Sequence, residues 1–222
     1  MSLIFEKIKP LYARIIEKFD NVAERIKENG IENFDWDNMV YSSKNFRRAH
    51  IEVLDRIESN NMWIMHVTVF PNLNDPSPIF GFDIVSTGKK VSGIFHDFSI
   101  TVDEQHPTQL WFIEQVNKLT WKKERELPDW GKKIFSKNMI AAGSITSEEE
   151  LEQIINTCLD NLDYYLLKVG TNNILSPAIK EKQNYYCKCQ KENPYPIKML
   201  VNFGLTKEQA EEFVNNHLFP EV

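Results

Sequence analysis

Four stretches decide the fold: RAHIEVLDRI at residues 48–57, MWIMHVTVF at 62–70, IFGFDIVS at 79–86 and VSGIFHDFS at 91–99. Each stretch is rich in the β-branched and aromatic residues that favour strands, and turn-forming residues separate it from the next. Because the joins are short, consecutive strands are expected to pair antiparallel. The stretches therefore predict a β-meander.

Helical patterns lie on both sides of these strands. Apolar residues recur every three or four positions over residues 3–28, and Gly30 is placed to end that helix. Pro194 and Pro196 are expected to interrupt the chain near its end. The remaining predicted helices cover residues 108–119, 147–168, 177–191 and 206–218, of which the second and fourth begin at capping boxes. This order predicts one α+β domain over residues 1–222, with helices covering a mostly antiparallel sheet.

Composition excludes several classes of protein. The 222 residues carry a formal net charge of −6, whereas nucleic-acid-binding domains usually carry a basic excess. A hydrophobic content of 42% and an aromatic content of 12% are too high for a disordered chain. Apolar runs are too short to span a membrane, and the charged N-terminus is unlike a signal peptide. We therefore expect a cytoplasmic protein without a nucleic-acid or membrane partner.

The usual cofactor motifs are also missing. The sequence has no glycine-rich phosphate loop, no nucleophile elbow and no dinucleotide fingerprint, which argues against hydride transfer from a bound nicotinamide. The spacing of Cys187 and Cys189 does not fit a zinc site. Three cysteines in such a chain are expected to be reduced thiols.

Polar side chains stand at strand spacing in the predicted sheet. His50 and Glu52 share one face of their strand, because side chains alternate. His66 and Asp83 lie among apolar neighbours on the next two strands. Adjacent strands can bring Glu52, His66 and Asp83 to one patch. Since a buried carboxylate is costly to ionise and histidine exchanges protons near pH 7, the pattern predicts a proton-handling pocket.

The same residues allow other interpretations. His50, Glu52 and His66 are the ligand types of a two-histidine, one-carboxylate iron site, although their spacing is weakly specific. A histidine or acid in a strand is also often a purely structural residue. Pattern alone leaves these alternatives open.

Motifs that occur in a fixed order resemble those of the ferredoxin-dependent bilin reductases. They are FRRAHIE at 46–52, MHVTVFP at 65–71, PIFGFDIV at 78–85, DFS at 97–99, RELPDWG at 125–131, IFS at 134–136, YYC at 185–187 and HLF at 217–219. The resemblance covers roughly residue 34 to the end. It is closest to the phycocyanobilin:ferredoxin oxidoreductase branch and to its phage-type relatives, which form phycoerythrobilin.

The resemblance implies a fold and an activity. The fold is a three-layer α/β/α sandwich with a central antiparallel sheet flanked by helices. The activity is a radical, four-electron reduction of biliverdin IXα to a phycobilin. Electrons come singly from a reduced [2Fe-2S] ferredoxin, and the enzyme is a monomer that binds no metal and no organic cofactor.

The resemblance also assigns roles to residues. Asp83 matches the family's central aspartate, His66 its histidine partner, and Glu52 a glutamate near the D-ring vinyl group. We predict these three as catalytic. His50 and Asn193 are predicted to line the pocket. Further predicted substrate contacts are Arg47, Arg48, Lys198 and Met199, of which the cations suit the two propionates.

Ferredoxins are acidic and this chain is net negative, so docking requires a local basic patch. The candidates are Lys118, Lys122, Lys123, Lys132 and Lys133. A solvated surface without a partner is the alternative for these lysines.

Two departures from the family pattern bear on the product. Asn193 is followed by Pro-Tyr-Pro-Ile-Lys198 instead of a charged run, and Gly143 replaces an arginine. Glu52 favours phycocyanobilin, whereas the altered tail favours phycoerythrobilin. We predict phycoerythrobilin, with phycocyanobilin as the alternative, and a non-catalytic bilin carrier as a rival of another class.

Overall fold

A seven-stranded antiparallel sheet forms the centre of the computed structural model, which describes residues 3–28, 31 and 34–222. Its strands lie in chain order from β1 to β7, so the predicted meander is confirmed and extends beyond the four predicted strands. The strands are β1 (Glu24–Ile26), β2 (Asp37–Ser42), β3 (Phe46–Arg56), β4 (Met62–Pro71), β5 (Ile79–Thr87), β6 (Lys90–Ser99) and β7 (Ile140–Ile145).

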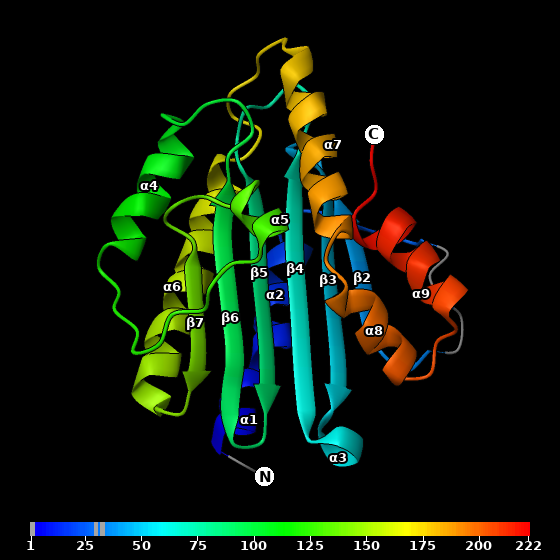
Figure 1. Cartoon of the computed structure of the whole chain (residues 1–222). Coiled ribbons are helices and arrows are strands. Elements are labelled where there is room, and N and C mark those ends of the chain that lie inside the picture. The colour runs from blue at the N-terminus through cyan, green and yellow to red at the C-terminus, as the bar shows by residue number, and fades with distance from the viewer. Residues whose placement is uncertain (1–2, 29–30, 32–33) are drawn as a thin grey trace.

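Helices cover both faces of this sheet (Figure 1). They are α1 (Leu3–Ile8), α2 (Pro10–Asp20), α3 (Ile57–Asn60), α4 (Pro107–Val116), α5 (Asp129–Lys132), α6 (Glu148–Lys168), α7 (Pro177–Lys191), α8 (Tyr195–Asn202), α9 (Lys207–Phe213) and the π-helix η1 (Val214–Leu218). The three-layer α+β sandwich is therefore confirmed. No helix within the described residues is both long and apolar enough to cross a membrane.

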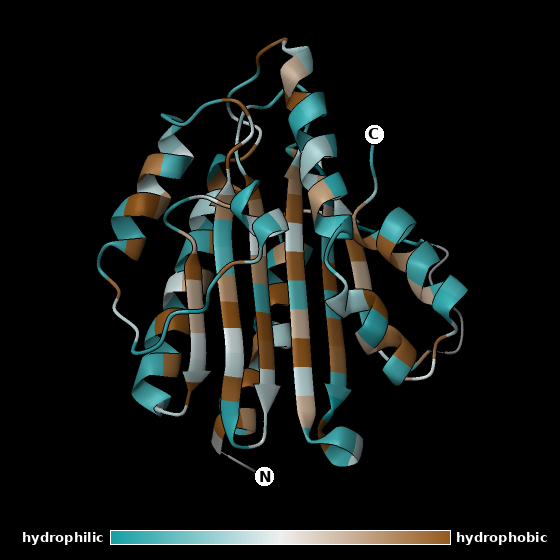
Figure 2. Ribbon diagram, viewed as in Figure 1, coloured by the Kyte–Doolittle hydropathy of each residue, from teal (hydrophilic) through white to brown (hydrophobic). Residues whose placement is uncertain are grey.

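Each face of the sheet has its own apolar core. Figure 2 shows hydrophobic and more hydrophilic residues as successive bands along the strands. On one face, α1, α2, α4 and α6 pack on side chains such as Val67 and Phe82. On the other face, α7, α8 and α9 pack on Leu54, Phe70 and Ile79. This second layer leaves part of its sheet face accessible to solvent, since Val85 and Phe95 are only partly buried.

Several predicted boundaries are wrong. The helix over 3–28 is two helices that end at Asp20, and residues 24–26 form β1 instead, because they pair with residues 40–42 of β2. Gly30, predicted to end the helix, lies outside the described residues. The helix predicted over 108–119 ends at Val116, and the last helix changes to a π-helix at Val214.

The interruption expected at Pro194 and Pro196 is confirmed, because α7 ends at Lys191 and a separate helix, α8, begins at Tyr195. Both prolines lie at the cap and first turn of α8, where a helix has no need of the amide hydrogen that proline lacks. The strands β2 and β7 were not predicted. β7 has the sequence IAAGSI, whose small residues favour a strand weakly, so that its pairing with β6 decides its conformation.

Candidate active site

Glu52, His66 and Asp83 stand side by side across three neighbouring strands. The register pairs Glu52 of β3 with His66 of β4, and His66 with Asp83 of β5. Because directly paired residues point to the same face of a sheet, the three side chains form one row. The predicted convergence of these residues is therefore confirmed. The row lies on the face that α7 and α8 partly cover.

His66 and Asp83 form a hydrogen-bonded pair. His66 Nδ1 lies 2.5 Å from Asp83 Oδ1. Burial alone would lower the pKa of His66, but the carboxylates of Asp83 and Glu52 outweigh burial and raise it. The His66 side chain is 12% exposed and that of Asp83 is 39% exposed. The pair therefore holds a proton between a nearly buried ring and a carboxylate that solvent or a ligand can reach.

Glu52 is the buried end of the row. It is only 5% exposed, and its carboxyl has no hydrogen bond with another side chain among the described residues. Burial raises the pKa of Glu52 to about 7, with His66 opposing the shift and Asp83 adding to it. This carboxyl therefore exchanges a proton near neutral pH, as a general acid or base requires.

His50 is fully buried beside the row. Its Nε2 lies 2.5 Å from Asn38 Oδ1, and because an amide oxygen only accepts, Nε2 carries the proton. Burial and the neighbouring cations hold the pKa of His50 well below its usual value, so the ring is neutral. Its Nδ1 has no hydrogen-bond partner in the described structure. His50 is thus a neutral, buried ring with one unpaired acceptor nitrogen, next to the proton-carrying pair.

The iron-site alternative is not supported by these contacts. Asp83 and the hydroxyl of Thr68 engage the two ring nitrogens of His66, and Asn38 engages His50 Nε2. Within residues 3–28, 31 and 34–222, no three His, Cys, Asp or Glu side chains are arranged to hold a metal ion. All three cysteines are buried and free.

Comparison with known proteins identifies the family to which the chain belongs. Residues 6–220 match the family described as ferredoxin-dependent bilin reductase. The chain belongs to this family. It is therefore an oxidoreductase, and its family uses ferredoxin as electron donor. The resemblance found in the sequence motifs is confirmed.

Named relatives of this bilin reductase agree. Phycocyanobilin:ferredoxin oxidoreductase of Prochlorococcus marinus (strain MIT 9515) is 30% identical over 192 residues, which are 82% of this chain and 76% of that protein. The solved structure of PcyX is 27% identical with a TM-score of 0.72, over 97% of this chain and 99% of that one. Phytochromobilin synthase from tomato, solved in complex with biliverdin, is 16% identical with a TM-score of 0.76 over 95% and 82% of the two chains, and shares the fold.

Both arginines predicted to bind substrate carboxylates are engaged within the bilin reductase itself. Arg48 is buried, forms an ion pair with Glu28 and donates to the backbone oxygen of His217. Arg47 lies over the Phe70 ring, 4.5 Å from its centroid, and its Nε donates to Gln183 of α7. Their role in binding the substrate stays a prediction.

Three other predicted contacts lie around the join of α7 and α8. Asn193 Oδ1 accepts a hydrogen bond from the Tyr195 backbone at 3.1 Å, which fixes the start of α8. Met199 packs against the apolar core on the site side, and Lys198 is exposed without an ion pair in the described structure. Their contacts with substrate also stay predictions.

Sequence reasoning missed a cation at the outer edge of the sheet. The Arg125 backbone donates to Ala141 of β7, and Gly143 of β7 donates to Lys123, so residues 123–125 run along β7. A Cβ on Gly143 would lie 2.5 Å from Arg125 Cδ, so the glycine makes room for the arginine side chain. Arg125 is exposed and has no ion-pair partner in the described part of the chain. Two sequence signals pointed to this cation: Arg125 begins the RELPDWG motif, and an arginine is lost at 143.

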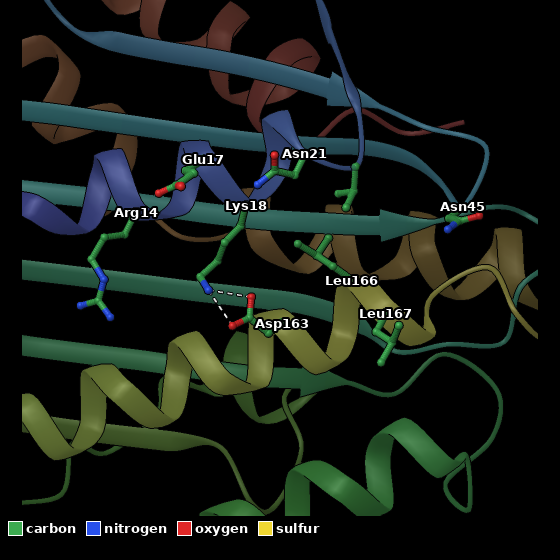
Figure 3. Close-up of a pocket in the computed structure, with 9 residues that line it drawn as sticks. Arg14, Glu17, Lys18, Asn21, Asn45, Asp163, Leu166 and Leu167 are labelled. Carbon is green, nitrogen blue, oxygen red and sulfur yellow. Dashed lines mark hydrogen bonds and ion pairs between the residues drawn. The ribbon is translucent and has the colours of Figure 1, made fainter.

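A hollow in the surface lies away from the row (Figure 3). It is formed by α2, α6 and the turn before β3, and the ion pair of Lys18 with Asp163 crosses it at 2.6 Å. Both helices pack on the sheet face opposite the row of Glu52, His66 and Asp83. We therefore place the candidate active site at the row and not at this hollow.

Proposed function

We propose that this bilin reductase converts biliverdin IXα to phycoerythrobilin with four electrons from a reduced [2Fe-2S] ferredoxin and four protons from the site. The observation that carries the proposal is the single row of Glu52, His66 and Asp83 in a chain of this family. The electrons arrive one at a time, so the bilin passes through radical states. We extend the proposal to a monomer that works in the cytoplasm.

Asp83 is the proposed proton donor to the bilin. Each electron makes the bilin more basic, so a nearby acid can protonate it. Of the row, Asp83 is the most exposed side chain and is hydrogen bonded to His66. His66 supplies the proton that Asp83 passes on, and the two groups titrate as a coupled pair.

Glu52 and His50 are proposed to direct where the protons go. The pKa of Glu52, raised to about 7 by burial, lets it protonate a second position of the bilin. His50 Nδ1 can accept a hydrogen bond from a pyrrole or lactam N–H. Whether reduction reaches the D-ring vinyl group through Glu52 decides between phycoerythrobilin and phycocyanobilin, the alternative product.

Arg125 is the proposed ligand of one propionate. Its side chain lies on Gly143, which pairs with Gly93 of β6, two residues along the strand from the position opposite Asp83. Gly143 and Asp83 lie two strands apart and two residues offset along the strands, about 12 Å from each other. That distance suits a substrate whose rings cover Asp83 and whose carboxylate reaches the sheet edge.

Replacement of Asp83 by Asn tests the proposal. We expect the variant to bind biliverdin within about threefold of the wild type, because the side-chain volume is kept, and to lose at least about 100-fold in turnover. Anaerobic absorption spectra with reduced ferredoxin follow both steps. Asp163→Asn, on the opposite face, should react normally.

The same time course separates the alternatives. A transient radical followed by a blue-shifted product supports the reductase, and chromatography of that product distinguishes phycoerythrobilin from phycocyanobilin. Biliverdin that binds but keeps its spectrum would identify a carrier. Full turnover by the Asp83 variant would contradict the assigned role.

A further inference from the structure

Thr68 follows His66 by two residues on β4 and points to the same face of the sheet. Its side chain is fully buried, and Thr68 Oγ1 lies 2.5 Å from His66 Nε2. On the other side of the ring, His66 Nδ1 lies 2.5 Å from Asp83 Oδ1. Groups of the protein therefore engage both nitrogens of His66.

The threonine hydroxyl suits either protonation state of that histidine. An ionised Asp83 only accepts, so a proton resides on Nδ1. When His66 is a cation, Nε2–H donates to Thr68 Oγ1; when Nε2 is unprotonated, the hydroxyl rotates and donates to it. Valine at this position would fill the same volume but would leave Nε2 without a partner.

The other groups around His66 do not replace this contact. Glu52 and His50 face it from β3, Asp83 faces it from β5, and the Phe219 ring lies 5.7 Å away at the C-terminal end. Among the described residues, Thr68 provides the only hydrogen bond to Nε2. An N–H donor that is buried without an acceptor is costly, most of all in a cation.

We propose that Thr68 is a positioning residue, which holds His66 through Nε2 so that His66 exchanges protons only through Nδ1 and Asp83. The proposal rests on the proposed bilin reduction. In each transfer, one electron comes from ferredoxin and one proton passes from His66 Nδ1 to Asp83, whose carboxyl gives it to the reduced bilin. His66 is left neutral, with its remaining proton on Nε2 and hydrogen bonded to Thr68, and a proton from solvent returns through the exposed Asp83 carboxyl to Nδ1 before the next transfer. Asp83 thus touches the substrate, and His66 acts through it.

The first test uses the ligand-free protein. Thr68→Val removes the hydroxyl at constant volume, and Thr68→Ser keeps the hydroxyl but loses the methyl group. NMR titration of labelled histidine, with the His66 signal assigned by a His66→Gln variant, should show the pKa of His66 lower by about one unit in Thr68→Val, because the cation loses its acceptor. Thr68→Ser should titrate like the wild type.

The second test follows the reaction with biliverdin and reduced ferredoxin. Thr68→Val should bind biliverdin within about threefold of the wild type but turn over about 10- to 100-fold more slowly, the usual effect of losing a group that orients a reactive one. The limb of the pH profile that reports loss of the His66 proton should move to lower pH. Thr68→Ser should restore both rate and profile.

The outcomes separate the two proposals. An unchanged His66 titration and pH profile in Thr68→Val would overturn the role of Thr68. Equal impairment of both Thr68 variants would overturn it too, because it would assign the effect to packing of the methyl group. If the wild-type protein does not reduce biliverdin, the proposed function fails, while the NMR titration still decides whether the hydroxyl controls His66.

Discussion

Glu52 shows how a single buried side chain affects both chemistry and stability. Burial raises its pKa to about 7 from an ordinary value of 4.5, so between these pH values the folded protein binds more protons at Glu52 than the unfolded chain does. The contribution of Glu52 to the free energy of unfolding therefore falls as pH rises through this window and is constant above it.

Replacing Glu52 by Gln removes this dependence. We expect Glu52→Gln to gain stability relative to the wild type by up to about 3 kcal/mol between pH 4.5 and 7.5. Urea unfolding at pH 5 and at pH 8 measures the difference. The exposed Glu126 provides a control, since Glu126→Gln should leave the pH dependence of the free energy of unfolding unchanged. Parallel curves for the Glu52 variant and the wild type would contradict the buried, proton-binding carboxyl.

The residues of the row could be predicted because strand alternation fixes them. A period of two places His50 and Glu52 on one face, and antiparallel neighbours then bring His66 and Asp83 beside them. The contact of Thr68 with His66 could not be predicted, since threonine in a strand is common and its hydrogen bond depends on the side-chain rotamer. Strand alternation therefore predicts which face of the sheet a side chain occupies, but not which group it hydrogen bonds.

At the scale of elements, the sequence predicted the helix starts, which depend on neighbouring residues, and missed strands that depend on pairing with distant segments. Ser147 and Thr206 each cap a helix within one turn, and both helices begin there. The capping box is complete only at Thr206, because the Glu150 carboxylate accepts from the Lys122 backbone instead of the Ser147 backbone. β1 and β7 form only because they pair with strands formed by other parts of the chain. The same applies to residues 123–125, whose position along β7 places Arg125 over Gly143.

The position of Arg125 at the edge of the sheet leads to a prediction about how the substrate carboxylates bind. Arg125→Gln should weaken the binding of biliverdin about tenfold or more, because one propionate would lose its charged partner. The same substitution should leave the affinity for biliverdin dimethyl ester unchanged, because the ester has no propionate charge. Gly143→Ala should act in the same direction, because the new Cβ would lie 2.5 Å from Arg125 Cδ and would displace the side chain. Absorption titrations with both bilins measure these affinities, and equal loss for acid and ester would contradict the carboxylate contact.

At the scale of the whole molecule, the net charge of −6 opposes an acidic electron donor, so local charges decide where docking occurs. Three of the lysines predicted for docking are in ion pairs: Lys118 with Glu114, Lys132 with Glu126, and Lys133 with Glu192. In the described residues, Lys122 and Lys123 are exposed and have no such partner. These two lysines precede Arg125 at the edge of β7, next to the proposed propionate contact.

We therefore expect the Lys122→Glu, Lys123→Glu double variant to raise the KM for ferredoxin severalfold with little change in kcat, since exposed charges act mainly on association. Lys118→Glu is the control. It changes the net charge by −2 against −4 for the double variant, and it should raise the KM by less than half as much because Glu114 already compensates Lys118. Raising the ionic strength from about 0.05 to 0.3 M should increase the KM of the wild type more than that of the double variant. Equal KM values for the double variant and the Lys118 variant, at equal affinity for biliverdin, would place the docking surface elsewhere.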